Sequence, residues 1–156
     1  MPKSPLDTIN RKILTSLQRD GRMAFHDLAA RVGLTPSPTL RRVRLLEEAK
    51  IIRGYVAVVD QKAVGLPISI FASVKLERQR EHDINRFATA VEGWPEVVEC
   101  YLMTGQRDYL LRIVVPDLEA YEVFLKTKLT RLEGVGSIES SFALAQVKHT
   151  NVLPIP

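Results

Sequence analysis

The hydrophobic period of this chain changes once, near residue 51. Before that point apolar residues recur at the three-to-four-residue spacing of amphipathic helices, and after it they alternate or run in short blocks typical of strands. This order indicates a helical module followed by an α+β module. A chain of 156 residues is long enough for two small domains. We predict a helical domain over residues 1–52, a linker strand and hinge over 53–66, and a second domain over 67–156.

The first module is predicted to contain three helices. Residues 6–20 and 26–32 each carry an apolar stripe, and Gly33 supplies the left-handed turn that ends the second helix. Thr35 and Pro36 resemble an N-cap followed by a proline in the first helical turn, so a third helix is expected over 36–50.

The second module follows the order β-α-β-β-α-β. Such an order is typical of ferredoxin-like folds, in which two helices cover one face of an antiparallel sheet. The expected strands are 68–77, 97–105, 108–115 and 138–149, and the expected helices are 81–94 and 118–133.

The other face of this sheet is expected to be largely apolar as well. In the strand 108–115, Leu110, Arg112 and Val114 alternate with the residues that point toward the helices. A domain of this size has no spare element to cover that face. We therefore expect the same face of a second copy to cover it, in a two-fold homodimer.

Positive charge is concentrated in the first module. The net charge of +4 divides into eleven basic and six acidic residues up to residue 60, against eleven basic and twelve acidic residues beyond it. This asymmetry favours a polyanion-binding module joined to a nearly neutral one.

The segment HDLAARVGLTPSPTLRRVRLLEEAKII has the pattern of a helix-turn-helix. The second of its helices enters the major groove by its N-terminus, where small side chains let the backbone approach the bases and arginines contact guanine or phosphate. Arg41 or Arg42 is expected to contact a base and Arg44 a phosphate; Arg22, and Arg11 or Lys12, are further phosphate candidates. The expected DNA-binding residues are Arg22, Ser37, Pro38, Thr39, Arg41, Arg42 and Arg44.

Two other interpretations of this helix are open. Its arginines are also compatible with a solvated face, and a helical module can contact a protein in place of DNA. The acids Glu47 and Glu48 lie only at the far end of the helix, which leaves its first turns positive, and only Leu45 is apolar on the outer face. Both observations favour DNA.

Nothing in the sequence indicates catalysis, a metal site or a cofactor. The histidines at positions 26, 82 and 149 lie in separate elements, and no catalytic or phosphate-loop pattern is present. The single cysteine, Cys100, lies in an apolar run and is expected to be buried and inert. There is no apolar run of about 20 residues and no signal-peptide pattern, so we expect a cytoplasmic protein without membrane contact.

A turn at Gly105 to Tyr109 is the candidate ligand site. Turn N–H groups can hold a carboxylate and Asp108 can accept an ammonium group, which together suit a zwitterion. An ordinary hairpin turn is the alternative.

The whole sequence resembles the Lrp/AsnC, or leucine-responsive (feast/famine), family of transcriptional regulators. The resemblance rests on LDTINRKILTSLQRDGR, LAARVGLTPSPTLRRVRLLEEAKIIRGYVAVVD, TGQRDYLLRIVVPDLEAY and the terminal SSFALAQVKHTNVLP. Two positions depart from it: Lys50 stands where a helix-ending glycine is usual, and Leu45 where a basic residue is frequent.

The resemblance implies an amino-acid effector bound in a cleft between dimers, and dimers that associate into a ring, taken here as an octamer. The leading effector-binding candidates that it implies are Gly105, Asp108 and Tyr109, with Thr104, Gln106 and Arg107 lining the turn. Ser140 and Ser141 are further candidates as hydroxyl donors, and Met103 is a candidate contact for the effector side chain, with a core position as its alternative. A homodimer would present two helix-turn-helix units to a pseudo-palindromic operator in double-stranded DNA. Effector binding would then change assembly or the spacing of those units, and Asp108→Ala is expected to remove the effector response without removing basal DNA binding.

Overall fold

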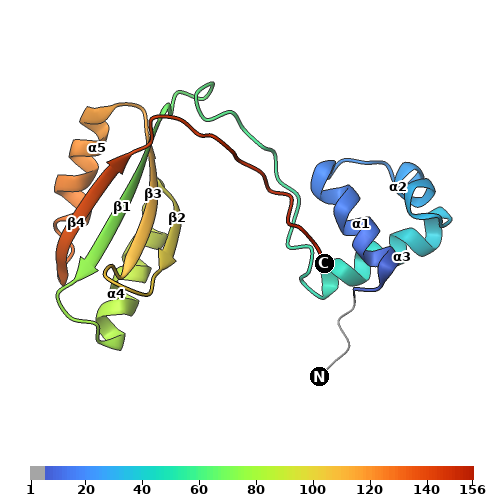
Figure 1. Ribbon diagram of the computed structural model, residues 1–156, viewed down its shortest axis with the longest axis horizontal. Helices are drawn as coiled ribbons and strands as arrows, with labels where there is room; N and C mark the ends of the chain where they lie inside the picture. The colour runs from blue at the N-terminus through green and yellow to red at the C-terminus, as the bar shows by residue number, and fades with distance from the viewer. Residues whose placement is uncertain (1–5) are drawn as a thin grey trace. The chain divides into compact units, whose positions relative to one another are not determined.

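The computed structural model of the chain describes residues 6–156 (Figure 1). Its contacts define two compact units. One contains the described residues up to Val58 together with Val147–Pro156, and the other is Val59–Gln146. No helix among the described residues is both long enough and apolar enough to span a bilayer.

The first unit contains three helices, as predicted: α1 (Thr8–Arg19), α2 (Phe25–Val32) and α3 (Pro36–Glu48). Asp7 caps α1 by accepting a hydrogen bond from the Asn10 N–H at 2.7 Å. Apolar residues from all three helices form the core of this unit, in which Ile13, Leu28, Val43 and Leu46 are almost completely buried.

Helices α2 and α3 both end with a left-handed residue. Gly33 has φ +77°, and the Leu34 N–H donates to the Ala29 carbonyl. Lys50 has φ +57°, and the Ile51 N–H donates to the Leu46 carbonyl. Both ends are therefore Schellman motifs, in which the left-handed residue lets the chain turn back over the helix end.

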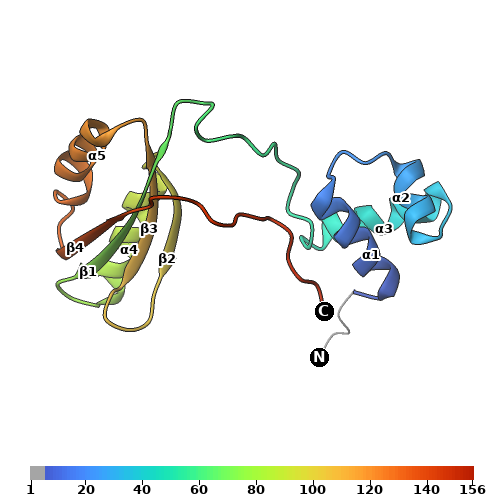
Figure 2. The ribbon, with the colours of Figure 1, turned by 45° about the horizontal axis from the view of Figure 1, so that its top comes forward.

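The second unit has the predicted β-α-β-β-α-β order. Its elements are β1 (Ile68–Leu76), α4 (Glu81–Glu92), β2 (Val97–Leu102), β3 (Tyr109–Val115), α5 (Leu118–Phe124) and β4 (Val135–Phe142). The strands form an antiparallel sheet in the order β2-β3-β1-β4 (Figure 2), so the predicted ferredoxin-like α+β fold is confirmed.

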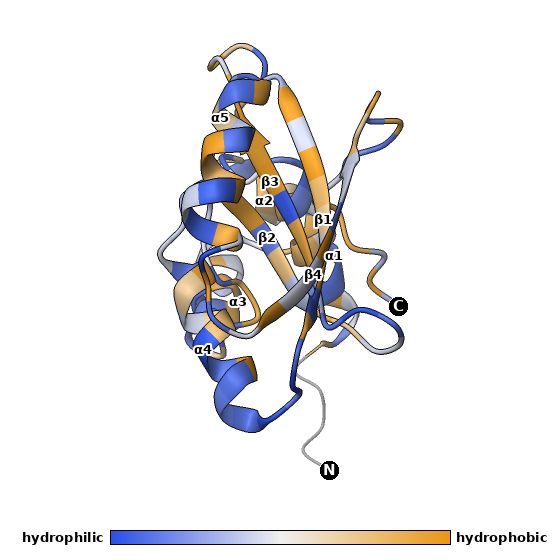
Figure 3. Ribbon diagram, turned by 90° about the vertical axis from the view of Figure 1, so that its left-hand side faces the viewer, coloured by the Kyte–Doolittle hydropathy of each residue, from blue (hydrophilic) through white to orange (hydrophobic). Residues whose placement is uncertain are grey.

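The core of the second unit lies between the sheet and its two helices. Alternate residues of β1 and β3 face the helices and are buried, because side chains of a strand point to opposite faces in turn. In Figure 3 β1 and β3 are largely orange, whereas α4 and α5 each carry many blue residues. Phe87 stacks on Tyr109 with ring centroids 4.3 Å apart, and Trp94 packs edge-on against Phe124 at 5.5 Å.

The last helix is shorter than the expected 118–133. Regular α-helix ends at Phe124 and a π-helical turn follows over Leu125–Leu129. The Thr130 hydroxyl donates to the Leu125 carbonyl at 2.9 Å, and the Thr127 hydroxyl to the Val123 carbonyl at 2.7 Å. The Thr130 N–H also donates to the Leu125 carbonyl, five residues back, which is the hydrogen bond of a π-helical turn.

The predicted linker strand and the last predicted strand also differ from expectation. Residues 53–66 form no strand in the described chain, since the alternating valines there have no partner strand and Val56 and Val58 are largely exposed. Strand β4 ends at Phe142, well before 149. The final residues pack with the helices: the Leu153 backbone exchanges hydrogen bonds with the Gln18 amide, and Ile155 contacts the helical core.

The prediction that Cys100 is buried is wrong. Cys100 is exposed and lies in β2, which is an edge strand of the sheet. Its apolar neighbours still desolvate the thiol and raise its pKa.

Candidate DNA interface and effector turn

One face of α3 carries exposed polar and basic residues. Ser37, Arg41 and Arg44 follow one another at four and three residues, so they lie along one side of the helix, and all three are exposed. Pro38 is exposed beside Ser37. Neither Arg41 nor Arg44 forms an ion pair within the described residues, which leaves both guanidinium groups available to a polyanion.

Thr39 does not belong to this exposed face. Its side chain is completely buried, and its hydroxyl donates to the Thr35 carbonyl at 2.9 Å. The structure therefore differs from the sequence expectation: Thr39 secures the first turn of α3 and does not reach the surface.

Arg42 also differs from the expectation of a DNA contact. Its Nη1 donates to Asp7 Oδ2 at 2.6 Å and to Asn10 Oδ1 at 2.9 Å. The Asn10 N–H and the Arg42 guanidinium together lower the pKa of the Asp7 carboxyl. Arg42 thus ties α3 to the start of α1.

Arg22 lies in the turn between α1 and α2. Its side chain is exposed, and its N–H donates to Asp20 Oδ1 at 3.0 Å. This is compatible with the predicted phosphate contact.

The predicted effector turn lies between β2 and β3. The Met103 N–H donates to the Asp108 carbonyl at 2.8 Å and closes the turn, and Gly105 adopts φ +105°, which glycine permits. Met103, Thr104, Gly105 and Gln106 are exposed. Among the described residues, the backbone N–H groups of 104–107 donate to no other group, so the turn presents free donors.

Asp108 is buried, and each oxygen of its carboxylate accepts a hydrogen bond within the protein. Oδ2 accepts the Leu76 N–H and Oδ1 accepts the Gln79 side-chain amide, both at 2.7 Å. The backbone N–H of Asp108 donates to the Val74 carbonyl. The expected role of Asp108 as the acceptor of a ligand ammonium group does not fit this geometry, because the carboxylate holds the end of β1.

Tyr109 is likewise part of the core. Its ring is 3% exposed and stacks on Phe87, and its hydroxyl donates to the Ile84 carbonyl at 2.9 Å. Burial raises the pKa of this hydroxyl. Its side chain therefore faces α4, away from the exposed turn.

The remaining effector candidates separate into two groups. Arg107 reaches β4, where it donates to the Ser137 hydroxyl and to Glu139. Ser140 and Ser141 point to opposite faces of β4, and Ser140 hydrogen-bonds with Tyr121 on the helix side. Arg107 thus belongs to the exposed turn, whereas the Ser140 side chain lies on the helix side of the sheet, away from it.

Two polar contacts were missed by reasoning from sequence. They are the Asp7–Arg42 pair and the Gln79–Asp108 hydrogen bond, which join residues 35 and 29 positions apart. The only signal for the first was an acidic residue at the predicted start of α1. Nothing in the sequence marked Gln79.

Two family models match the chain. Residues 6–47 match the AsnC-type helix-turn-helix domain, and residues 69–153 match the Lrp/AsnC ligand binding domain. The chain belongs to the Lrp/AsnC family. It is accordingly a DNA-binding transcriptional regulator with a ligand-binding C-terminal domain, and it is not an enzyme.

Close relatives match over almost their whole length. The Bkd operon transcriptional regulator of Pseudomonas aeruginosa is 46% identical over 96% of this chain and 98% of its own length. The leucine-responsive regulatory protein of Escherichia coli is 40% identical over 99% of this chain and 94% of its own.

Solved structures give the same result. A transcriptional regulator of Neisseria meningitidis in complex with L-Met is 40% identical and superposes with a TM-score of 0.91, covering 96% of both chains. An AsnC family regulator of Agrobacterium tumefaciens is 41% identical, with a TM-score of 0.90 over 96% of this chain and 97% of its own.

Proposed function

We propose that this regulator binds operator DNA through Ser37, Pro38, Arg41 and Arg44, with Arg22 as a flanking phosphate contact. The observation that carries the proposal is the exposed face of α3, on which Arg41 and Arg44 have no acidic partner among residues 6–156. Arg42 and Thr39 are omitted because their polar groups serve the helical unit itself. Two such units in a dimer fit a pseudo-palindromic operator in double-stranded DNA.

The matched variants Arg41→Ala and Arg42→Ala test this assignment. Both remove one positive charge from neighbouring positions of α3, and both are titrated against the DNA upstream of the regulator's own gene. We expect Arg41→Ala to weaken operator binding by about 1–3 kcal/mol and to reduce discrimination against an unrelated duplex. Equal discrimination by Arg41→Ala and the parent protein would contradict the proposal.

The effector is proposed to be a free amino acid bound at the exposed turn of residues 103–107. The free N–H groups of the turn suit its carboxylate, and Met103 and Gln106 are exposed beside them. The related protein in complex with L-Met makes this amino acid the first to test. Asp108 and Tyr109 are buried at the end of the turn and hold it by hydrogen bonds and packing inside the protein.

A thermal-shift screen of the common amino acids identifies the effector. A ligand that binds only the folded protein raises its melting temperature in a concentration-dependent way. Any amino acid that does so is then tested against Gln106→Ala, which we expect to weaken the shift without changing the melting temperature of the free protein. A screen in which no amino acid changes the melting temperature would contradict the proposal.

We further propose that the regulator acts in the cytoplasm as a homodimer, and that dimers assemble into an octamer with the effector between them. The dimer would form through the sheet face opposite α4 and α5. Phe71 is exposed at the centre of that face, next to Arg112 of β3 and Ser141 of β4. Effector binding between dimers would couple assembly to the spacing of the DNA-binding units.

A further inference from the structure

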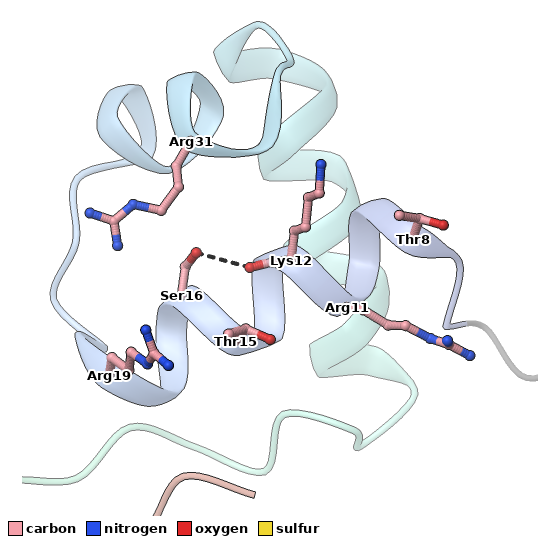
Figure 4. Close-up of a pocket in the computed structure, with 7 residues that line it drawn as sticks. All are labelled: Thr8, Arg11, Lys12, Thr15, Ser16, Arg19 and Arg31. Atoms are coloured by element: carbon pink, nitrogen blue, oxygen red, sulfur yellow. Dashed lines mark hydrogen bonds between the residues drawn. The ribbon is translucent and has the colours of Figure 1, made fainter. Parts of the chain in front are cut away.

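A second concentration of positive charge lies away from the exposed face of α3. A hollow of about 440 Å³ opens between α1 and α2 (Figure 4). Side chains from both helices line it, and none of them is acidic or apolar. They are Thr8, Arg11, Lys12, Thr15, Ser16, Arg19 and Arg31.

The four cations around this hollow lack acidic partners. Arg11, Lys12, Arg19 and Arg31 are exposed, and within the described part of the chain none of them forms an ion pair. Even Asp27, one turn before Arg31 on α2, makes no such contact with it. Like charges held together without counter-charges repel one another, so an anion in the hollow would be stabilised.

The polar floor of the hollow is already ordered. Ser16 is buried, and its hydroxyl donates to the Lys12 carbonyl of the same helix at 2.9 Å. Thr8 and Thr15 add short hydroxyl side chains between the longer basic ones. Short donors flanked by long cations are suited to phosphate oxygens.

From this arrangement we propose that the hollow between α1 and α2 binds the phosphate backbone of duplex DNA, outside the contact made by α3. Arg11 and Arg19 are eight residues apart on α1, a rise of about 12 Å. The same length of B-DNA carries roughly three to four phosphates on each strand. The row of cations therefore matches a short stretch of the DNA phosphate backbone. A protein interface usually has apolar residues at its centre, and none line the hollow, so an acidic protein is a poorer fit.

This surface is separate from the proposed reading face. The side of α1 opposite the hollow buries Ile13 and Leu14 in the core, and the reading residues all lie on α3. The hollow carries no base-reading geometry of its own. Contacts at the hollow would therefore add affinity for DNA of any sequence and increase the salt dependence of binding. The inference rests on the proposed DNA-binding function.

The test is a salt titration of DNA binding by the full-length double variant Arg19→Ala/Arg31→Ala. Its matched control is Lys62→Ala/Arg78→Ala, which removes two exposed charges from the second unit. Each phosphate contact that is lost makes the slope of log affinity against log salt shallower by about 1. For the double variant we expect this slope to be shallower by about 2. Its affinities for the operator and for an unrelated duplex should fall by the same factor, and its melting temperature should be unchanged.

A slope equal to that of the control variant would overturn the inference, and so would weakening confined to the operator. Including Arg41→Ala in the same titration separates this result from failure of the main proposal. If Arg41→Ala loses discrimination while the double variant behaves as the control does, only the second surface is excluded. If neither variant changes DNA binding, the proposed reading face is wrong as well.

Discussion

At the scale of single residues, satisfied hydrogen bonds separate supporting side chains from those that can meet a ligand. Asp108 and Thr39 are buried with their polar groups paired inside the protein, and Arg42 is held by Asp7 and Asn10. A side chain in this position must break an existing contact before it can make a new one. Arg41 and Gln106 carry no such cost, because they are exposed and their side chains have no partner within the described part of the chain.

Asp108→Ala is expected to destabilise the second unit by about 1–3 kcal/mol, since the substitution leaves the Leu76 N–H buried without an acceptor. The loss of effector response should therefore accompany a loss of stability. Chemical denaturation monitored by circular dichroism measures the change, and Gln106→Ala in the same turn is the control that should retain full stability. Parental stability combined with lost effector affinity would show that the carboxylate serves the ligand directly.

Asp7→Asn is expected to lower the stability of the helical unit in a pH-dependent way. Asparagine caps a helix as well as aspartate does, so the substitution removes mainly the charge paired with Arg42. The native contacts lower the pKa of Asp7 below its ordinary value of 3.8. The stability from its charge is therefore present above that value and is lost as the pH falls through the lowered pKa.

Denaturation of the parent and of Asp7→Asn over a pH series measures this effect. The difference between them should be largest near neutral pH and should close in acid. A difference that stayed constant across the series would show that the cap, and not the charge, is responsible.

These residues also show what sequence can predict. Periodicity identified the buried stripes, and the exposed positions of Ser37, Arg41 and Arg44 follow from helical spacing alone. Periodicity did not identify the partner of Arg42 or of Asp108. Each partner lies far away in the sequence, and its position depends on how the whole unit packs. The candidate site was therefore predicted as a region, and its individual roles were not.

At the scale of elements, the ends of helices depend on local backbone geometry that sequence signals only in part. Gly33 was expected to end α2 and does so in the left-handed conformation. Lys50 adopts the same conformation at the end of α3, although it has a side chain that disfavours it. The early end of the regular helix in α5, at Phe124, had no such local marker in the sequence.

Lys50→Gly is consequently expected to stabilise the helical unit by about 0.5–1 kcal/mol, because glycine removes the strain of the left-handed backbone. The reverse change, Gly33→Ala, should destabilise it by about 1 kcal/mol even though the space around Gly33 is open. Urea denaturation of both variants measures the change in the free energy of unfolding and its sign. If Lys50→Gly were destabilising, contacts of the lysine side chain would have to outweigh the backbone strain.

At the scale of the whole molecule, the sheet face away from α4 and α5 is less apolar than the sequence suggested. Leu110 and Val114 lie on it, but Arg112 between them donates to Glu99 at 3.0 Å and to Gln61 at 2.8 Å. Gln61 also bonds Ser69, so the segment before β1 already covers part of this face. The apolar centre that remains is small and includes Phe71 and Tyr101, both exposed.

Phe71→Asp is therefore expected to weaken the proposed homodimer, because a charge at the centre of a buried face would be desolvated without a partner. Phe25→Asp is the matched control: Phe25 is similarly exposed, at 43% against 38%, but lies on α2 of the other unit. Sedimentation velocity over a concentration series measures the assembly of both. We expect Phe71→Asp to shift the protein toward monomers and Phe25→Asp to sediment as the parent does. Unchanged assembly of Phe71→Asp would mean that subunits meet through another surface, and the exposed valines of residues 53–66, which form no strand in the described chain, would then be the next segment to test.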